Sequence, residues 1–211
     1  MIISKTVAIY VFDEIEVLDL GGPFEVFSVA NRLAAKDGRD QPFNVVTVSS
    51  GADIVQARGG YRFCPSHNFA NVPPADVLVV PGGVVDHECA RPDVIAWLRQ
   101  AHDGAELTAS VCTGAFLLAE AGVLTGLEVT THWEDIDELE RRYPDLHVLR
   151  DRLWVDEGRV VTSGGISAGI DMSLHLVRRL EGLDLARRVA RQMEYDWRSL
   201  SGIAEQTGVN R

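Results

Sequence analysis

The sequence predicts an α/β fold in a single domain, built on a doubly wound, mostly parallel sheet with helices on both faces. Short apolar, β-branched runs alternate along the chain with longer segments of helical periodicity, as in parallel sheets whose strands are joined by crossover helices. No repeat, low-complexity stretch or long linker divides the 211 residues. A chain of this length buries about 70% of the surface of its unfolded state, so its core needs no metal or disulfide.

The first two thirds of the chain alternate strand and helix. Residues 6–12 form a continuous apolar run, typical of a strand that is buried on both faces. Gly21-Gly22-Pro23 then interrupts the chain before helical spacing over residues 24–35. The further strands expected here are 43–48, 77–80 and 107–111, and the further helices are 92–102, which begins at Pro92, and 112–122, which ends at Gly122.

The last third begins with a short strand at 128–131 and an acidic helix at 133–142, which stops before Pro144. Residues 152–156 and 159–162 form a predicted hairpin, because Glu157-Gly158 separates two apolar runs. Helices are expected at 166–180 and from 183 to 195.

Composition and charge exclude several classes of protein. The chain has 20 Lys and Arg residues against 31 Asp and Glu residues, and the net charge of −11 would repel a phosphate backbone, so this chain alone is not expected to bind nucleic acid. With three cysteines and no CxxC pair, neither a disulfide framework nor a structural zinc site is expected. No cleavage site follows the N-terminal apolar run, and no window approaches the ~20 apolar residues of a membrane helix. We therefore expect a cytoplasmic protein that does not bind membranes.

Cys112 is the residue best placed for chemistry. It lies where a buried strand is predicted to turn into a helix, among small residues, as in a nucleophile elbow. The dipole of a following helix lowers the pKa of a thiol, so we expect a reactive thiolate. The alternative is a buried structural cysteine, which is the state expected for Cys64 and Cys89.

Further candidates follow other strands, because ligands of such sheets bind beyond the carboxyl ends of the strands. Asp19 follows the first strand and is expected at the same edge as Cys112, although an Asp at this position could instead cap the next helix. Gly82 and Gly83 follow the central strand. Their amides can approach a ligand closely, which makes them oxyanion-hole candidates, although Gly-Gly is also a common turn.

His132, in Thr130-Thr131-His132-Trp133, stands out among the six histidines, and Gly165 follows the predicted hairpin at the expected site edge. A lone histidine is more often packed or exposed than functional. No histidine pair has HxxxH or HExxH spacing, so no metal is expected.

Several of these segments together resemble the DJ-1/PfpI superfamily over residues 5–195. The resemblance rests on Val17-Leu18-Asp19-Leu20-Gly21-Gly22-Pro23, Ser110-Val111-Cys112-Thr113-Gly114-Ala115, Thr130-Thr131-His132-Trp133, Thr162-Ser163-Gly164-Gly165-Ile166 and Met193-Glu194-Tyr195-Asp196. Within the superfamily, the chain is most similar to isonitrile hydratases and to the amidotransferase-like domains of AraC-type regulators.

The resemblance implies a flavodoxin-like fold, a homodimer, no cofactor, and Cys112 as nucleophile. Protease-like members have histidine after the cysteine, where this chain has Thr113, which argues against peptidase activity. Many relatives have glutamate at the position of Asp19. The hydratases have aspartate there, as this chain does, which favours that branch. The resemblance also implies that Gly83 and the elbow amides stabilise negative charge, and that His132 lies near the thiol.

A mechanism follows as a hypothesis. A Cys112 thiolate would add to the terminal carbon of an isonitrile while protonated Asp19 donates a proton. Thr113 would orient the substrate or the water that then releases an N-substituted formamide.

Two alternatives remain open. One is a metabolite-sensing domain related to AraC-type regulators, and the other is a different DJ-1-type activity, such as a glyoxalase or a redox-sensing thiol. We expect residues 1–198 to form the domain and residues 199–211 a tail. The tail resembles the opening of a helix-turn-helix but has no recognition helix after it, and a frayed terminus is the alternative.

Overall fold

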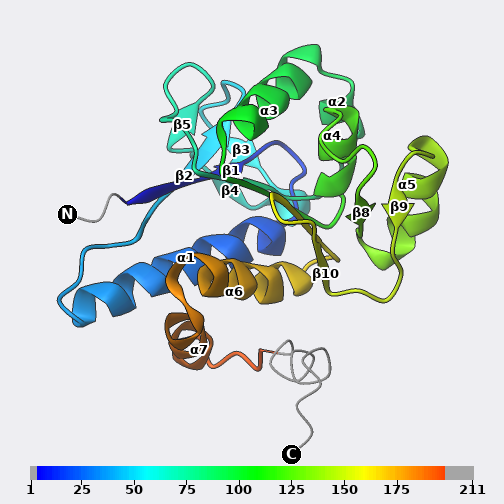
Figure 1. The fold of residues 1–211 in the computed structure, drawn as a ribbon. Helices are drawn as coiled ribbons and strands as arrows, with labels where there is room; N and C mark the ends of the chain where they lie inside the picture. The colour runs from blue at the N-terminus through cyan, green and yellow to red at the C-terminus, as the bar shows by residue number, and fades with distance from the viewer. Residues whose placement is uncertain (1–3, 198–211) are drawn as a thin grey trace, which may run out of the picture.

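A computed structural model describes residues 4–197 and contains a seven-stranded sheet in the order β10-β11-β7-β6-β1-β2-β5 (Figure 1). The neighbouring strands are parallel, apart from the antiparallel β10–β11 pair. The strands are β1 Lys5–Tyr10, β2 Phe43–Ser49, β5 His67–Asn68, β6 Val77–Val80, β7 Leu107–Val111, β10 Trp154–Asp156 and β11 Val160–Ser163. The predicted α/β fold is therefore confirmed.

Helices cover both faces of this sheet (Figure 1). One face carries α1 Val17–Lys36, α6 Ala168–Glu181 and α7 Leu183–Gln192, and the other carries α2 Asp86–Cys89, α3 Pro92–Gly104 and α4 Gly114–Glu120. Outside the main sheet lie helix α5 Ile136–Arg142, the 3-10 turns η1 Arg58–Gly60 and η2 Trp133–Asp135, and the strand pairs β3 Val55–Gln56 with β4 Arg62–Phe63 and β8 Glu128–Val129 with β9 His147–Val148.

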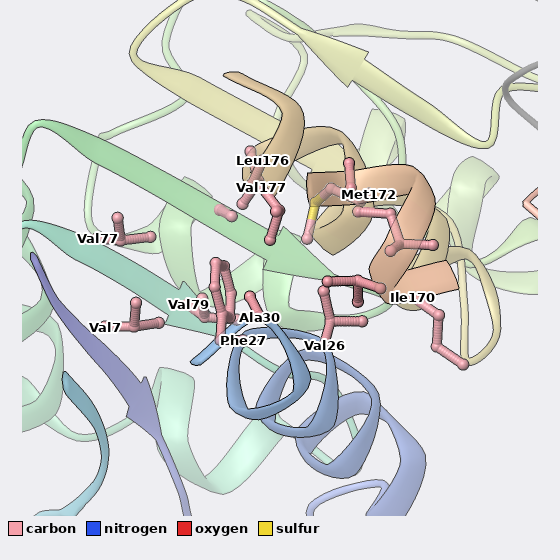
Figure 2. Close-up of a cluster of buried hydrophobic side chains, with 14 of the residues drawn as sticks. Val7, Val26, Phe27, Ala30, Val77, Val79, Ile170, Met172, Leu176 and Val177 are labelled. Atoms are coloured by element: carbon pink, nitrogen blue, oxygen red, sulfur yellow. The ribbon is translucent and has the colours of Figure 1, made fainter. Parts of the chain in front are cut away.

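The central strands are buried on both faces, which explains their continuous apolar runs. Val77 and Val79 of β6 point toward α1 and α6, where Phe27 and Val177 complete the cluster drawn in Figure 2. Leu78 and the other alternate residues of β6 pack on the opposite face, against α3 and α4. Side chains that alternate between two cores fix the register of the sheet and hence the position of each strand end.

Helix α1 begins earlier than the sequence predicts. It starts at Val17 and includes Gly21-Gly22-Pro23, so Asp19 lies in its first turn and not in a loop after the strand. A Cβ atom on Gly22 would lie 2.9 Å from Cγ1 of Ile170, so this glycine permits the close approach of α1 and α6. Tertiary packing here overrides the weak helix propensity of the segment.

Other element boundaries also differ from the prediction. The predicted strand 128–131 is shortened to β8 and pairs with β9 outside the main sheet. The predicted helix 133–142 begins with the 3-10 turn η2, and the helix expected to reach residue 195 ends at Gln192. The sequence does not predict the short elements α2, β3, β4, β5 and β9, because two to four residues carry no measurable periodicity.

Within residues 4–197, no helix has both the length and the apolar character needed to cross a bilayer. The tail predicted at 199–211 lies outside the described residues, and the domain boundary at 198 remains a prediction.

Asp156 connects the β10–β11 hairpin to α6. Its Oδ1 atom accepts hydrogen bonds from the Gly158 amide and from Arg179 Nη1, both at 2.9 Å, and its Oδ2 atom accepts one from His175 Nε2 at 2.6 Å. Burial acts to raise the pKa of this carboxyl, but His175, the Gly158 amide and Arg179 outweigh it, and the pKa is lowered.

Replacing this carboxylate should destabilise the protein. Asp156→Asn is expected to reduce the free energy of unfolding by about 1–2 kcal/mol at neutral pH, because hydrogen bonds to a charged group are lost. The folded-state pKa lies below the unfolded value of about 3.9, so the contribution is present above that value and is lost as the pH falls through the folded-state pKa. Urea unfolding at a series of pH values should show the difference from wild type shrinking on acidification.

Glu157→Gln, at the exposed neighbouring carboxylate, is the control and should change stability by less than about 0.5 kcal/mol. Equal losses in the two variants, or a loss in Asp156→Asn that does not change with pH, would contradict this account.

Candidate active site

Cys112 forms a sharp turn between β7 and α4. Its φ of 56° lies in the left-handed region, which residues other than glycine rarely adopt, and the residue is only 8% exposed. Its amide donates to the carbonyl oxygens of Ser163 and Gly164, both at 3.2 Å, and its carbonyl oxygen accepts a hydrogen bond from Thr131 Oγ1 at 2.8 Å. Such strained backbone persists only where the surroundings enforce it. The chain thus has the turn that a nucleophile elbow requires.

Two glycines allow the elbow to approach the loop that follows β6. A Cβ atom on Gly114 would lie 2.0 Å from the carbonyl oxygen of Val80, and one on Gly82 would lie 2.6 Å from the amide nitrogen of Thr113. Both obstacles are backbone atoms, which cannot rotate away as a side chain can. The small residues that the sequence places around Cys112 are therefore required by the packing of two adjacent strand ends.

The amides of Gly82 and Gly83 are both engaged by side chains. The Gly82 amide donates to Oδ2 of Asp19 at 3.0 Å. The Gly83 amide donates to Oγ1 of Thr113 at 2.9 Å, and the Thr113 hydroxyl donates to the Gly83 carbonyl oxygen at 2.9 Å. In this arrangement these groups position Asp19 and the loop. The oxyanion role of the two glycines and the orienting role of Thr113 remain predictions.

Asp19 lies beside the elbow and is fully buried. Burial raises its pKa to about 7, and the charge of Glu16 acts in the same direction. The Gly82 amide, the Cys112 thiol and the Ile166 amide oppose this rise. Its Oδ1 atom makes no hydrogen bond of ordinary geometry with any described residue.

Helix capping, the alternative considered for Asp19, does not occur. The N-cap residue of α1 is Glu16, which makes no capping hydrogen bond through its side chain, and the bonded Asp19 oxygen accepts from Gly82. A buried carboxyl group with a pKa near neutrality beside a thiol is instead typical of a functional site.

The thiol of Cys112 is neutral at rest, which corrects the expectation of a thiolate. Burial raises its pKa to about 12, and the charges of Asp19 and Asp135 add to the rise, while contacts with the Thr113 amide and hydroxyl oppose it. The following helix, α4, has only seven residues. The contacts that favour the thiolate therefore do not compensate for the loss of water around the sulfur.

His132 and Gly165, which the sequence singled out separately, lie in contact. A Cβ atom on Gly165 would be 2.1 Å from Cδ2 of His132, so the imidazole packs directly on the glycine backbone. Nδ1 of His132 accepts a hydrogen bond from the Glu134 amide at 3.4 Å and lies 3.4 Å from Oδ2 of Asp135. Burial raises the pKa of Asp135, and the opposing effect of the neighbouring His132 is smaller, so the net pKa is raised.

Sequence reasoning missed Asp135 and Ile166. Asp135 acts electrostatically on the thiol and Ile166 on the Asp19 carboxyl. The available signal for Asp135 was a carboxylate three residues after His132, which places the two side chains on one face of a helical turn. Ile166 acts on the Asp19 carboxyl through its backbone amide. The identity of a side chain gives no indication of such a contact, so the sequence could not reveal it.

A cavity of about 580 Å³ adjoins the elbow. Its lining includes Thr131 and Gly164, the same residues that bind the backbone of Cys112. In the described part of the chain, no three His, Cys, Asp or Glu side chains are grouped so that they could hold a metal ion.

Known proteins match most of this chain. The sequence profile of the DJ-1/PfpI family matches residues 5–179. The chain is 35% identical to isonitrile hydratase of Pseudomonas putida over 191 residues, and this alignment covers 87% of this chain and 75% of the hydratase. It is also 28% identical to the HTH-type transcriptional regulator GbdR of Pseudomonas aeruginosa over 193 residues, and this alignment covers 91% of this chain and 51% of the regulator. The chain thus spans about half the length of that regulator.

Solved structures give the same fold. A ThiJ/PfpI family protein from Pseudomonas syringae superposes with a TM-score of 0.81 at 25% identity, covering 92% of this chain and 76% of that chain. DJ-1beta of Drosophila melanogaster superposes with a TM-score of 0.77 at 21% identity, covering 92% of this chain and 100% of that chain.

Because Gly114 lies so close to the backbone of Val80, adding one methyl group at this position should strongly reduce the stability of the protein. Gly114→Ala should lower the free energy of unfolding by about 1–3 kcal/mol, because the added Cβ overlaps the carbonyl oxygen of Val80. Gly104→Ala, at the end of α3, is the matched control. Its Cβ would meet no atom within 4 Å, so stability should rise slightly or stay unchanged. Thermal and urea unfolding measure both, and a Gly114→Ala protein as stable as wild type would contradict the proposed packing.

Proposed function

The chain belongs to the DJ-1/PfpI family, and from this premise we propose that it is an enzyme that uses Cys112 and Asp19 to hydrate a small electrophile, an isonitrile, to an N-substituted formamide. The proposal depends on one observation, the burial of a thiol beside a carboxyl group whose pKa is about 7. A group with this pKa can both accept and donate a proton near neutral pH. The similarity to isonitrile hydratase supports the choice of electrophile.

In the first step, ionised Asp19 accepts the proton of the neutral Cys112 thiol as the sulfur adds to the terminal carbon of the isonitrile. The S–H bond breaks and a C–S bond forms. Asp19 then delivers the same proton to that carbon, which gives a thioimidate with no net gain or loss of protons. Because the thiol is neutral at rest, Asp19 acts first as a base.

In the second step, Asp19 is ionised again and takes a proton from a water molecule. The water oxygen adds to the thioimidate carbon, and the imine nitrogen gains the proton. Collapse of this adduct breaks the C–S bond, releases the formamide and returns the hydroxyl proton to the sulfur through Asp19. The sum is the isonitrile plus one water, and both catalytic groups are regenerated.

The remaining site residues have proposed supporting roles. Thr113 and Gly83 hold the loop against the elbow, and the elbow amides stabilise negative charge on the adduct. His132, packed on Gly165, is proposed to form a wall near the thiol that limits the size of the substituent on the substrate.

A second candidate function is ligand sensing without chemistry. The similarity to GbdR over 91% of this chain favours it, because that relative is a transcriptional regulator. A neutral, buried thiol is also compatible with a site that only binds. Turnover assays separate the two functions.

The proposal also includes a reducing cytoplasm and a homodimer. Cys64, Cys89 and Cys112 are all free, as expected for a protein kept reduced. The proposal of a homodimer is based on the family resemblance. Sedimentation equilibrium would measure the mass of the protein in solution and test it.

Substitution of the two reacting groups tests the chemistry. With cyclohexyl isocyanide, Cys112→Ala should form no formamide above the uncatalysed rate. Asp19→Asn keeps the shape of the side chain but cannot shuttle a proton, so kcat should fall by about 10²–10⁴-fold. Cys64, which the sequence predicted to be a buried structural cysteine, is instead exposed, whereas Cys89 is buried as predicted. Cys64→Ser should therefore retain wild-type activity.

Retained hydration in Cys112→Ala would remove the covalent step. Lactate formed from methylglyoxal in place of formamide would favour a glyoxalase. Absence of both products with the wild-type protein would overturn the enzyme proposal in favour of ligand sensing.

The pH profile tests the order of proton transfers. Because ionised Asp19 acts first, kcat/KM should rise about tenfold per pH unit below a midpoint near the Asp19 pKa of about 7 and level off above it. The Cys112 thiol titrates only near 12, so it adds no second limb in this range. A kcat/KM that falls with rising pH through neutrality would show that the protonated acid acts first.

A further inference from the structure

We infer that the cavity of about 580 Å³ beside the elbow binds the carboxylate group of a small organic anion, with Arg152 as the residue that recognises it. The volume falls within the range of about 300–1,000 Å³ typical of small-molecule sites. The inference goes beyond the proposed reaction, because neither Cys112 nor Asp19 lines this cavity.

Three distant segments of the chain build the cavity. Trp133 and Ile136 come from η2 and the start of α5, Arg152 and Leu153 precede β10, and Ser167 precedes α6. The backbone is tightly connected here, because the Gly164 amide donates to the Leu153 carbonyl oxygen at 2.9 Å. This hydrogen bond joins the segment before β10 to the segment before α6 at the cavity.

Arg152 is the available cation of this lining. Its neighbour Arg150 is already bound through Nη2 to Oδ1 of Asp137 at 2.6 Å and to Oε2 of Glu140 at 2.9 Å. Arg152 is exposed and makes no ion pair or side-chain hydrogen bond with any described residue. Its guanidinium lines the cavity without an acidic partner among the described residues, so it is available to bind an anionic ligand.

Asp151 narrows the class of ligand. This exposed carboxylate also lines the cavity, so it repels anions and disfavours a doubly charged phosphate more than a singly charged group. A carboxylate has the single charge and the planar pair of oxygens that a guanidinium binds in bidentate fashion. The charges of the lining therefore favour a monovalent carboxylate.

Trp133 indicates the body of the ligand. It is 74% exposed, more than any other large apolar side chain in residues 4–197, and it shares the cavity with Ile136 and Leu153. An exposed aromatic ring beside a cation is a surface suited to stack on an apolar or aromatic group. The expected ligand thus has an apolar body and one carboxylate.

The test uses benzoate and its uncharged isostere benzamide, titrated into the wild-type protein by calorimetry. Benzoate should bind at least about tenfold more tightly than benzamide, as expected for one charge-assisted hydrogen-bonded pair. Arg152→Gln should remove this preference. Asp151→Asn should strengthen benzoate binding severalfold, and asparagine tolerates the left-handed φ of 56° at this position.

Arg141→Gln controls for net charge, because Arg141 is an exposed arginine paired with Glu138 outside the cavity, and benzoate affinity should change by less than about twofold. Equal binding of benzoate and benzamide, no binding of either, or equal effects of Arg152→Gln and Arg141→Gln would overturn the inference. None of these readouts needs turnover, so their failure is distinct from failure of the proposed reaction.

A kinetic arm distinguishes the source of the carboxylate. If it belongs to the substrate, benzoate will compete with cyclohexyl isocyanide, and Arg152→Gln will raise KM only for an isonitrile that carries a carboxylate. If it belongs to a separate effector, benzoate will change the rate without competing. Both patterns support the site, and a benzoate effect that persists unchanged in Arg152→Gln would count against it.

Discussion

The buried, left-handed turn at Cys112 is the constraint on which the site depends. Strands β6 and β7 are adjacent and parallel, so their carboxyl ends bring the loop at Gly82 and the elbow to the same place. The two segments meet at backbone distance, which leaves no room for a side chain at Gly82 or Gly114. The Cys112 amide donates to the carbonyl oxygens of Ser163 and Gly164 at the end of β11, and Thr131, which follows β8, donates to the Cys112 carbonyl oxygen. Together these bonds fix the elbow. The strain at one residue is thus maintained by packing across three strand ends.

This packing also sets the electrostatics of the site. Taking the thiol and the Asp19 carboxyl out of water disfavours the charged form of both groups, so the resting pair holds its protons more tightly than either group does in solution. Asp19 remains able to ionise near neutral pH because the Gly82 amide donates to it. In the proposed mechanism, Asp19 therefore exchanges protons readily, and Cys112 becomes a nucleophile only when Asp19 accepts its proton.

The same scaffold occurs in relatives named as a hydratase and as transcriptional regulators, so the fold alone does not distinguish catalysis from sensing. The difference must come from the groups at the strand ends and from the cavity beside them. In this chain the buried thiol of Cys112 and the buried carboxyl group of Asp19 influence each other's pKa, while Arg152 and Trp133 line a cavity that neither of them lines. Such an arrangement allows chemistry and ligand recognition to occupy neighbouring parts of one protein.

The sequence by itself determined the fold class, the strands with apolar residues on both faces, and the elbow at Cys112, because burial and tight turns leave local patterns such as Val77–Val80 and Cys112-Thr113-Gly114. It also indicated that Asp19 and Cys112 would share one edge of the sheet. Only the tertiary structure decided that α1 begins before Asp19, that the thiol is neutral, and that Asp135 acts on it. These properties depend on burial and on contacts between segments far apart in the chain, and no local pattern of residues encodes them.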